Sequence, residues 1–189
     1  AAAELDAATL VTIGGGLHDL GPERPGALAR ARASVEEALP ALIEAATSAG
    51  VTLGVEPMHP VRIFSKGTLN TLAQTEALCA RHPGLGIALD VFHAWWEPDL
   101  DALLARLVDR IRVVQICGVT QPADPTRLPH RCLPADGIVD LAGMLARLRG
   151  CGYRGPYEFE LFAHELDGRT VPDMIGRAIA DFRSLDTEG

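Results

Sequence analysis

The sequence lacks the features of membrane, disulfide-linked and zinc-ribbon proteins. Its longest apolar runs fall short of the roughly 20 residues that cross a bilayer. Residues 1–8 are small and apolar but include Glu4 and Asp6 and no basic residue, so they do not form a signal peptide. None of the four cysteines lies in a CxxC pair or at zinc-ribbon spacing. These absences predict a cytoplasmic protein with free thiols at Cys79, Cys117, Cys132 and Cys151.

Basic residues are also in the minority. The chain has 17 Lys and Arg against 25 Asp and Glu, which gives a formal net charge of −8. Such a surface repels nucleic-acid phosphates and anionic lipid, so we expect neither nucleic acid nor membrane as a partner. Hydrophobic residues make up 48% of the 189, and no linker or low-complexity tract interrupts them. We therefore predict a single domain over residues 1–189.

Two hydrophobic periods alternate along the chain. Short apolar runs typical of buried parallel strands occur at Thr9–Ile13, Val51–Val55, Gly86–Leu89, Ile111–Ile116 and Tyr157–Leu161. Helical stripes lie between them, as in Leu100, Leu103, Leu104, Leu107 and Val108, in Leu141, Met144, Leu145 and Leu148, and in Met174, Ile175, Ala178, Ile179 and Phe182. Asp99 and Asp140 are predicted N-caps. A long helix is expected from about Pro25 to Gly50, kinked or split by Pro40.

This alternation predicts a parallel sheet covered by helices, with five βα units. An open doubly wound sheet is the alternative architecture, and its nucleotide-binding signature is a glycine-rich turn after the first strand. Gly14, Gly15 and Gly16 follow the first run but lack the GxGxxG spacing. We interpret them as a tight turn at a strand end.

Polar residues collect where the predicted strands end, which is where barrel active sites form. Glu56 follows one run, Asp90 and His93 follow the next, Gln115 lies within the third and Glu160 within the last. Alternation puts Glu160 nearer the carboxyl end than its same-face neighbour on that strand. Oxygen ligands of this kind suit Mn²⁺, Mg²⁺ or Co²⁺ better than a structural zinc ion.

Each of these residues has a structural alternative. Taken alone, Glu56 is as readily explained as a surface residue at the start of a loop as by a role in a site. Asp90 can be explained as a helix N-cap. Gln115 needs a buried partner, which a backbone group supplies as well as a ligand does. Trp95 and Trp96 either wall a pocket or plug the top of the barrel. The prediction of a site depends on the four strand-end positions together.

Five segments resemble the sugar phosphate isomerase/epimerase family, which is the xylose isomerase-like TIM barrel superfamily or AP endonuclease family 2. The segments read GVEPMHP, LNTLAQ, GIALDVFHAWWEPDL, HRCLPADGIVDL and GYRGPYEFELF. The resemblance implies a (β/α)₈ barrel of which this chain holds the C-terminal five βα units, since the family's first three units have no counterpart here. A sheet of five strands would leave two unpaired edges, so a homo-oligomer is a reasonable expectation.

The resemblance also implies roles for individual residues. The implied metal ligands are Glu56, Asp90, Gln115 and Glu160. Glu56 and Glu160 are the implied acid/base pair. The implied substrate contacts are His59, His93 and Arg131, and Trp95 is a candidate for the pocket wall. Relatives with the double-tryptophan stretch usually carry His at Gln115, Asp at Gly118 and Gly at Ala135. Arg131 has a surface salt bridge as its alternative interpretation.

The implied activity is a divalent-metal-dependent isomerisation or epimerisation of a small sugar, sugar phosphate or inositol-derived ketose through an enediolate. A lyase that dehydrates a related ketone would use the same enolate. A DNA-repair endonuclease of this superfamily needs many His ligands and a basic groove, whereas this acidic chain has six His. A third alternative is a degenerate, non-catalytic barrel that acts as a binding or assembly module. The departures from the family pattern at Gln115 and Gly118 motivate it.

Overall fold

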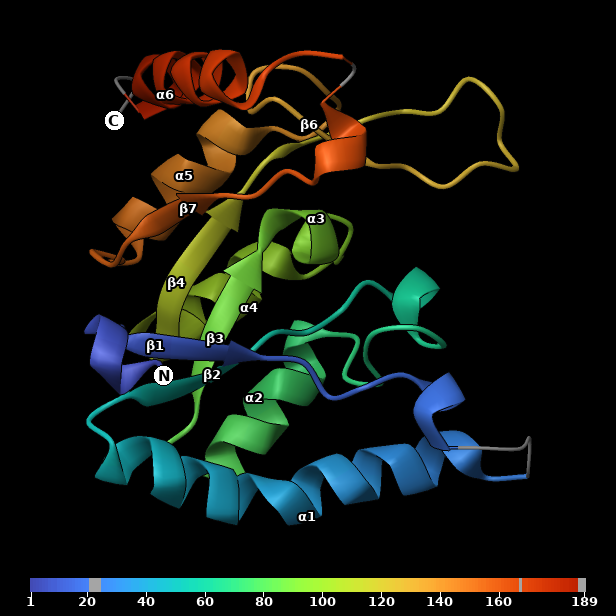
Figure 1. Cartoon of the computed structure of the whole chain (residues 1–189), viewed down its shortest axis with the longest axis vertical. Helices are drawn as coiled ribbons and strands as arrows, with labels where there is room; N and C mark the ends of the chain where they lie inside the picture. The colour runs from blue at the N-terminus through green and yellow to red at the C-terminus, as the bar shows by residue number, and fades with distance from the viewer. Residues whose placement is uncertain (21–24, 167, 187–189) are drawn as a thin grey trace.

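The computed structural model describes residues 1–20, 25–166 and 168–186. Five parallel strands form one curled sheet in the order β1-β2-β3-β4-β7, with helices outside it (Figure 1). The strands are β1 (Thr9–Thr12), β2 (Thr52–Val55), β3 (Gly86–Asp90), β4 (Ile111–Ile116) and β7 (Tyr157–Phe159). A two-stranded antiparallel ribbon pairs β5 (Gly118–Val119) with β6 (Arg131–Cys132). The parallel sheet confirms the predicted α/β class, as half of a (β/α)₈ barrel.

Helices alternate with the strands, as the hydrophobic periods predict. They are α1 (Ala27–Ser48), α2 (Leu72–Arg81), α3 (Val91–Ala94), α4 (Leu100–Leu107), α5 (Leu141–Gly150) and α6 (Val171–Asp186). The predicted apolar faces of α4 and α5 are buried in the core except for Val108, which follows α4 and is partly buried against it. Asp140 caps α5 by accepting a hydrogen bond from the Gly143 N–H at 2.9 Å, whereas Asp99 precedes α4 without a side-chain bond.

Two local predictions are confirmed only in part. Pro40 was expected to kink or split its helix, but α1 runs without a break from Ala27 to Ser48 and is curved (Figure 1). The stripe on α6 is also mixed: Met174 and Ala178 are buried, but Ile175 and Ile179 are 50% and 47% exposed. A 3.6-residue period shows that a helix has an apolar face but does not show which neighbour covers it.

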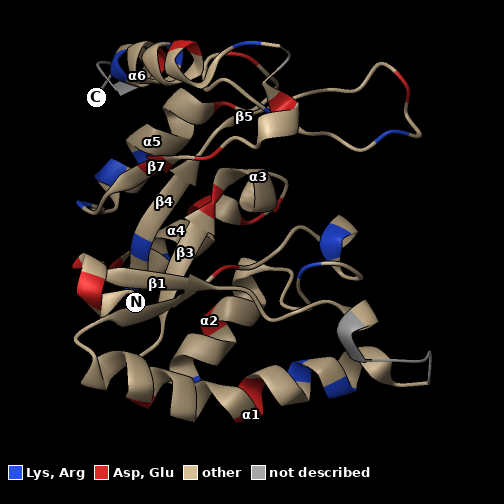
Figure 2. Ribbon diagram, in the orientation of Figure 1, with Lys and Arg blue, Asp and Glu red and all other residues tan. Residues whose placement is uncertain are grey.

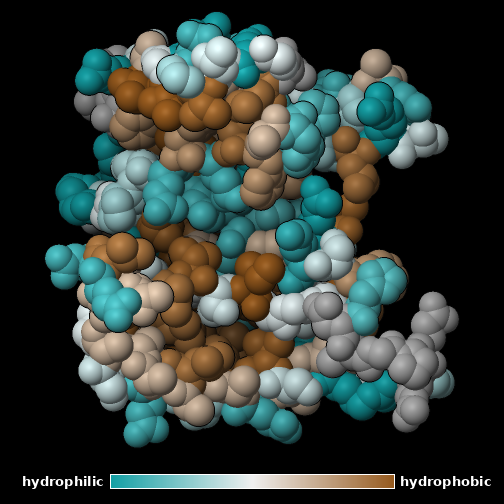
Figure 3. Space-filling view, in the orientation of Figure 1, coloured by the Kyte–Doolittle hydropathy of each residue, from teal (hydrophilic) through white to brown (hydrophobic). Residues whose placement is uncertain are grey.

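The sheet is open at β1 and β7 among the described residues, as five strands require. Apolar side chains are exposed near both edges, and brown surface flanks a hydrophilic belt in Figure 3. The exposed set includes Leu10, Ile13 and Leu42 near β1, and Val171, Ile175 and Ile179 on α6. No described helix is long and apolar enough to cross a membrane.

The carboxyl ends of the strands meet at one edge, where the connecting loops converge (Figure 1). After β1 the three glycines do not form the expected tight turn but continue as an extended segment, in which Gly15 has a positive φ of 73° and forms an isolated parallel bridge with Gly67. A Cβ at Gly16 would overlap the carbonyl oxygen of Phe64. This segment therefore lies directly against the loop that follows β2, and the close approach requires glycine.

Candidate metal centre and substrate pocket

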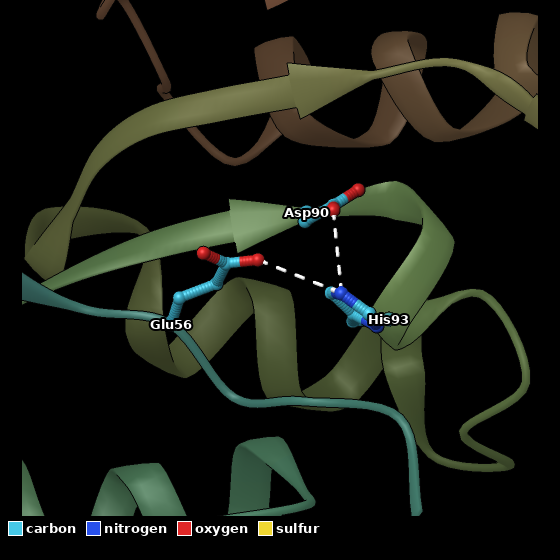
Figure 4. Close-up of side chains that lie close together, drawn as sticks. All are labelled: Glu56, Asp90 and His93. Carbon is cyan, nitrogen blue, oxygen red and sulfur yellow. Dashed lines mark ion pairs between the residues drawn. The ribbon is translucent and has the colours of Figure 1, made fainter. Parts of the chain in front are cut away.

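Two carboxylates and an imidazole come together at the ends of β2 and β3 (Figure 4). Ligand atoms of Glu56, Asp90 and His93 all lie within 4.8 Å of one another, and all three residues are buried. His93 Nε2 is 3.7 Å from Glu56 Oε1 and 3.7 Å from Asp90 Oδ2. Such a cluster is of the kind that can hold a metal ion.

The cluster is short of positive charge. Burial, with the nearby carboxylates of Asp90 and Glu160, raises the pKa of Glu56 to about 8. Burial raises the pKa of Asp90 to about 6, even though Arg131 acts in the opposite direction. The ionised forms of these buried carboxylates are unfavourable, and a cation beside them would stabilise these forms.

A hydrogen bond fixes the protonation of His93. Its Nδ1 accepts the backbone N–H of His59 at 3.1 Å, so in the neutral ring the proton is on Nε2, which points toward the two carboxylates. Burial, followed by Arg131 and more weakly by Arg62, lowers the pKa of His93 to about 3 and keeps the ring neutral. In this arrangement the Nε2–H of His93, and not a nitrogen lone pair, faces Glu56 and Asp90.

Arg131, in strand β6 of the β5–β6 ribbon, lies beside the cluster. The Arg131 side chain is 3% exposed, and its guanidinium pairs with Asp90 and lies 3.5 Å from Glu160 Oε2. The guanidinium is held between two aromatic rings, 4.5 Å from the centroid of Phe92 and 4.9 Å from that of Phe162. Arg131 is thus a buried part of the site and not a surface salt-bridge residue.

Two of the predicted ligands have a buried oxygen that accepts no hydrogen bond, although that of Glu160 forms an ion pair with Arg131. Gln115 Oε1 and Glu160 Oε2 are buried without a hydrogen-bond partner among the described residues. Gln115 Nε2 donates to Glu158 Oε2 at 3.4 Å, which turns the amide so that its oxygen stays free. Asp90 and Gln115 are register partners on β3 and β4, so their side chains share one face of the sheet. Buried acceptors without a donor are groups that a cation would satisfy.

A pocket of about 380 Å³ opens beside the cluster, a volume that suits a molecule of monosaccharide size. Of the residues predicted from the sequence, Glu56, His93, Arg131 and Glu160 line it. Six further lining residues were not predicted as site residues, namely Ile13, Met58, Arg62, Lys66, Phe162 and His164. They come from the connections after β1, β2 and β7, which only the folded chain brings together.

His59 and Trp95 are not among the lining residues. The His59 ring caps the short helix Pro60–Arg62 by accepting the Val61 N–H at 3.1 Å, and its edge faces Trp96. Trp95 packs against both core clusters beside Phe92. The substrate contacts predicted for these two side chains remain predictions.

Glu165 connects the two loops that flank Arg131. Its carboxylate is buried and accepts the backbone N–H of Arg131 at 2.8 Å and that of Phe162 at 2.9 Å. No sequence pattern pointed to this residue, because its partners are backbone groups. Glu165 thus ties the backbone of Arg131 to that of Phe162, whose ring is one of the two beside the guanidinium.

We expect Glu165→Ala to destabilise the protein strongly. Both N–H groups would lose their acceptor in a buried place, at a cost of about 1–3 kcal/mol each. Urea denaturation measures the change, with Glu37→Ala on the exposed face of α1 as the control. Equal midpoints for the two variants would show that Glu165 does not organise the site.

Comparison with known proteins identifies the fold family. The model described as xylose isomerase-like TIM barrel matches residues 1–185. The chain belongs to this family. A crystal structure from Sinorhizobium meliloti 1021 resembles this xylose isomerase-like chain with a TM-score of 0.84 and 33% identity, over 97% of this chain and 66% of that one. E. coli 3-keto-D-glucoside 4-epimerase, at 22% identity, shares the fold with a TM-score of 0.71, over 98% and 66% of the two chains.

Two curated relatives are named 3-dehydroshikimate dehydratase. The one from Pseudomonas putida is 34% identical over 110 residues, which are 56% of this chain and 17% of the relative. The one from Pseudomonas aeruginosa is 31% identical over 150 residues, 76% of this chain and 22% of the relative. The xylose isomerase-like chain thus spans about a fifth of the length of these relatives.

Proposed function

We propose that this protein binds one divalent cation, Mn²⁺, Mg²⁺ or Co²⁺, and isomerises or epimerises a small ketose, sugar phosphate or inositol-derived ketone. The observation that carries the proposal is the set of buried oxygens at the carboxyl ends of four neighbouring strands. Glu56 and Asp90 are buried carboxylates of raised pKa, and Gln115 Oε1 and Glu160 Oε2 have no hydrogen-bond donor among the described residues. Hard oxygen ligands in this number fit these cations.

These four side chains would hold the cation, and it would polarise the substrate carbonyl and offset the negative charge that develops on the substrate oxygens. Glu56 and Glu160 come from β2 and the end of β7, which are separated by two strands. Carboxylates on different sides of a bound substrate can remove a proton from one face and return it at the other. The raised pKa of Glu56 suits a group that exchanges protons near neutral pH.

His93 and Arg131 would orient the substrate. The Nε2–H of His93 points into the site and can donate to a substrate oxygen. Arg131 has a free Nε–H, which is buried and without a partner among the described residues. The aromatic rings on both sides restrict the guanidinium to one plane, so its remaining donors have a fixed direction.

Dehydration of a ketone is the second candidate, and the names of the two curated relatives favour it. It begins with the same loss of a proton next to a carbonyl. The two outcomes differ afterwards: an isomerase returns the proton to carbon, whereas a dehydratase expels a hydroxyl group.

Solvent exchange tests both candidates. The metal-loaded protein is incubated in D₂O with a panel of ketoses, inositol-derived ketones and 3-dehydroshikimate, and NMR follows the C–H signal beside the carbonyl. Metal-dependent deuterium incorporation supports the proposal, with an epimer as product for an isomerase and an enone or aromatic product for a dehydratase. A protein that binds no divalent metal, or binds it without exchange on any member, would indicate the non-catalytic barrel instead.

A further inference from the structure

The pocket beside the carboxylate cluster is lined by charged side chains from different connections, and basic residues occur on the loop after β2 (Figure 2). Glu56, Glu160 and His93 line it from the carboxyl ends of the strands. Arg62 and Lys66 line the same pocket from the loop that follows β2. Counting Arg131, cationic side chains outnumber carboxylates among the lining residues, although the chain as a whole carries a net charge of −8.

Backbone hydrogen bonds place Arg62 and Lys66 next to each other. The Lys66 N–H donates to the Arg62 carbonyl at 2.8 Å, which is one helical turn and brings side chains four residues apart to the same side. The loop is also tied to the chain after β1, because the N–H groups of Leu17 and His18 each donate at 3.0 Å to the carbonyls of Ile63 and Phe64. The two cations are therefore carried by an anchored turn.

Neither cation is neutralised within the described part of the chain. No described carboxylate forms an ion pair with Arg62 or Lys66, and no described group accepts a hydrogen bond from either side chain. The chain's other arginines in this region differ, since Arg32 bonds to the Thr68 carbonyl and Arg131 pairs with Asp90. Lys66 is the only lysine in the sequence.

The balance of charges in the pocket indicates a function for Arg62 and Lys66. The carboxylates at the strand end are matched by Arg131 and, in the proposed function, by one divalent cation. Nothing at that end remains to compensate Arg62 and Lys66. A planar guanidinium beside an ammonium, both facing a pocket of monosaccharide size, is a donor set for a carboxylate or a phosphate.

We propose that the substrate is a polyhydroxy ketone with an anionic group at one end, and that Arg62 and Lys66 bind this group while the ketone end lies at the carboxylate cluster. The inference rests on the proposed function and narrows its substrates to sugar acids or sugar phosphates, which leaves out neutral ketoses. Arg62 and Lys66 are then specificity residues that act by binding and not by proton transfer.

The single lysine makes a direct test possible. Reductive methylation with ¹³C-formaldehyde keeps the charge and labels Lys66, whose NMR peak is identified by its absence from the Lys66→Gln spectrum. The Mg²⁺-loaded protein is titrated with three unreactive polyols that differ at one end: D-gluconate, D-glucitol 6-phosphate and neutral D-glucitol. We expect a saturable shift of the Lys66 peak with at least one anion and none with D-glucitol at equal ionic strength.

The variant Arg62→Gln should weaken binding of the same anion by about tenfold or more, as loss of a hydrogen bond to a charged group predicts. Arg127→Gln, in an exposed loop, is the matched control and should bind like the wild type. A response to gluconate alone assigns a sugar acid, and one to the phosphate alone assigns a sugar phosphate. Equal shifts with D-glucitol, or an anion affinity that Arg62→Gln leaves unchanged, would overturn the inference.

Metal binding separates this result from the proposed function. Mg²⁺ binding is measured on the same samples by calorimetry. Normal Mg²⁺ binding without an anion response rejects the anionic substrate and leaves the metal centre standing. An anion response without Mg²⁺ binding supports the role of Arg62 and Lys66 and rejects the metal-dependent activity.

Discussion

Glu160→Gln is expected to reduce the Mn²⁺ content of the desalted protein from about one equivalent per chain to almost none. Glu160 Oε2 is buried, has no hydrogen-bond donor among the described residues and lies 3.5 Å from the nearest Arg131 nitrogen. A neutral amide at this place keeps the shape of the side chain but removes a negative ligand. Changes even to the groups behind a ligand cost 10–100-fold in metal affinity, so we expect a loss of about 100-fold or more here.

Glu158→Gln is the matched control for this experiment. Glu158 lies two residues earlier on the same face of the strand, but it is exposed and does not line the pocket. A glutamine there still accepts from Gln115 Nε2, so the amide oxygen of Gln115 keeps its orientation. Bound Mn²⁺, counted by mass spectrometry of the metal, should therefore be close to the wild-type value. Equal metal content in both variants would place the cation elsewhere or exclude it.

Glu160→Gln should also lose most of the proton-exchange activity. If Glu160 exchanges a proton with the substrate, its replacement lowers the rate of deuterium incorporation by about 10²–10⁴-fold, the usual size of a general acid/base contribution. Raising the Mn²⁺ concentration until the variant is saturated distinguishes the two roles. A rate that recovers fully at saturation would mean that Glu160 binds metal but moves no proton.

The five strands could be predicted from the sequence because each is a short apolar run with a polar end. β4 has the predicted bounds of Ile111–Ile116, and the others differ by one or two residues. Strand-end residues are also visible as local breaks in hydrophobicity, which is why Glu56, Asp90 and Glu160 stand out. Parallel strands bring their carboxyl ends to one edge, so a local pattern along the chain becomes a site in space.

The rest of the site could not be predicted because it depends on contacts between loops. Nothing near Lys66 or Phe162 in the sequence shows that both face one pocket. The function of Glu165 depends on two backbone N–H groups, which have no signature in the sequence. The tautomer of His93 is likewise decided by the backbone of His59 in another loop. Side-chain type predicts which chemistry is available, and packing decides which groups meet.

Gly118 is a further position where the sequence and the packing lead to different expectations. We expect its replacement to have a large effect on stability. Sequence resemblance suggests that an Asp here would restore a polar group to the site rim. In the structure Gly118 is buried at the start of β5, and a Cβ would overlap the carbonyl oxygens of Leu133 and Asp136 and lie 2.8 Å from Cys132 Sγ. The first two atoms belong to backbone, which cannot rotate away as a side chain can.

Gly118→Asp should therefore disrupt the site instead of restoring it. Gly118 pairs with Cys132, the neighbour of Arg131, so forcing β5 away from β6 displaces the guanidinium from Asp90. Overpacking costs about 1–3 kcal/mol and more where backbone must move, and the buried Asp90 carboxylate would lose its partner at a further cost of about 3–5 kcal/mol. A total of about 5 kcal/mol lowers the melting temperature by about 10–20 °C in a protein of this size.

Gly176→Ala in α6 is the control, because a Cβ there meets no atom within 4 Å. Alanine is a better helix former than glycine, so this variant should be more stable than the wild type by about 0.5–1 kcal/mol. Thermal denaturation followed by circular dichroism compares the three proteins. If Gly118→Asp melts with the wild type and still binds Mn²⁺, the β5–β6 ribbon has room for the side chain, and the path of residues 132–137 would have to differ from the one described. If Gly118→Asp melts at a lower temperature than the wild type and Gly176→Ala at a higher one, the glycine at position 118 is what allows the ribbon to bring Arg131 to the carboxylate cluster.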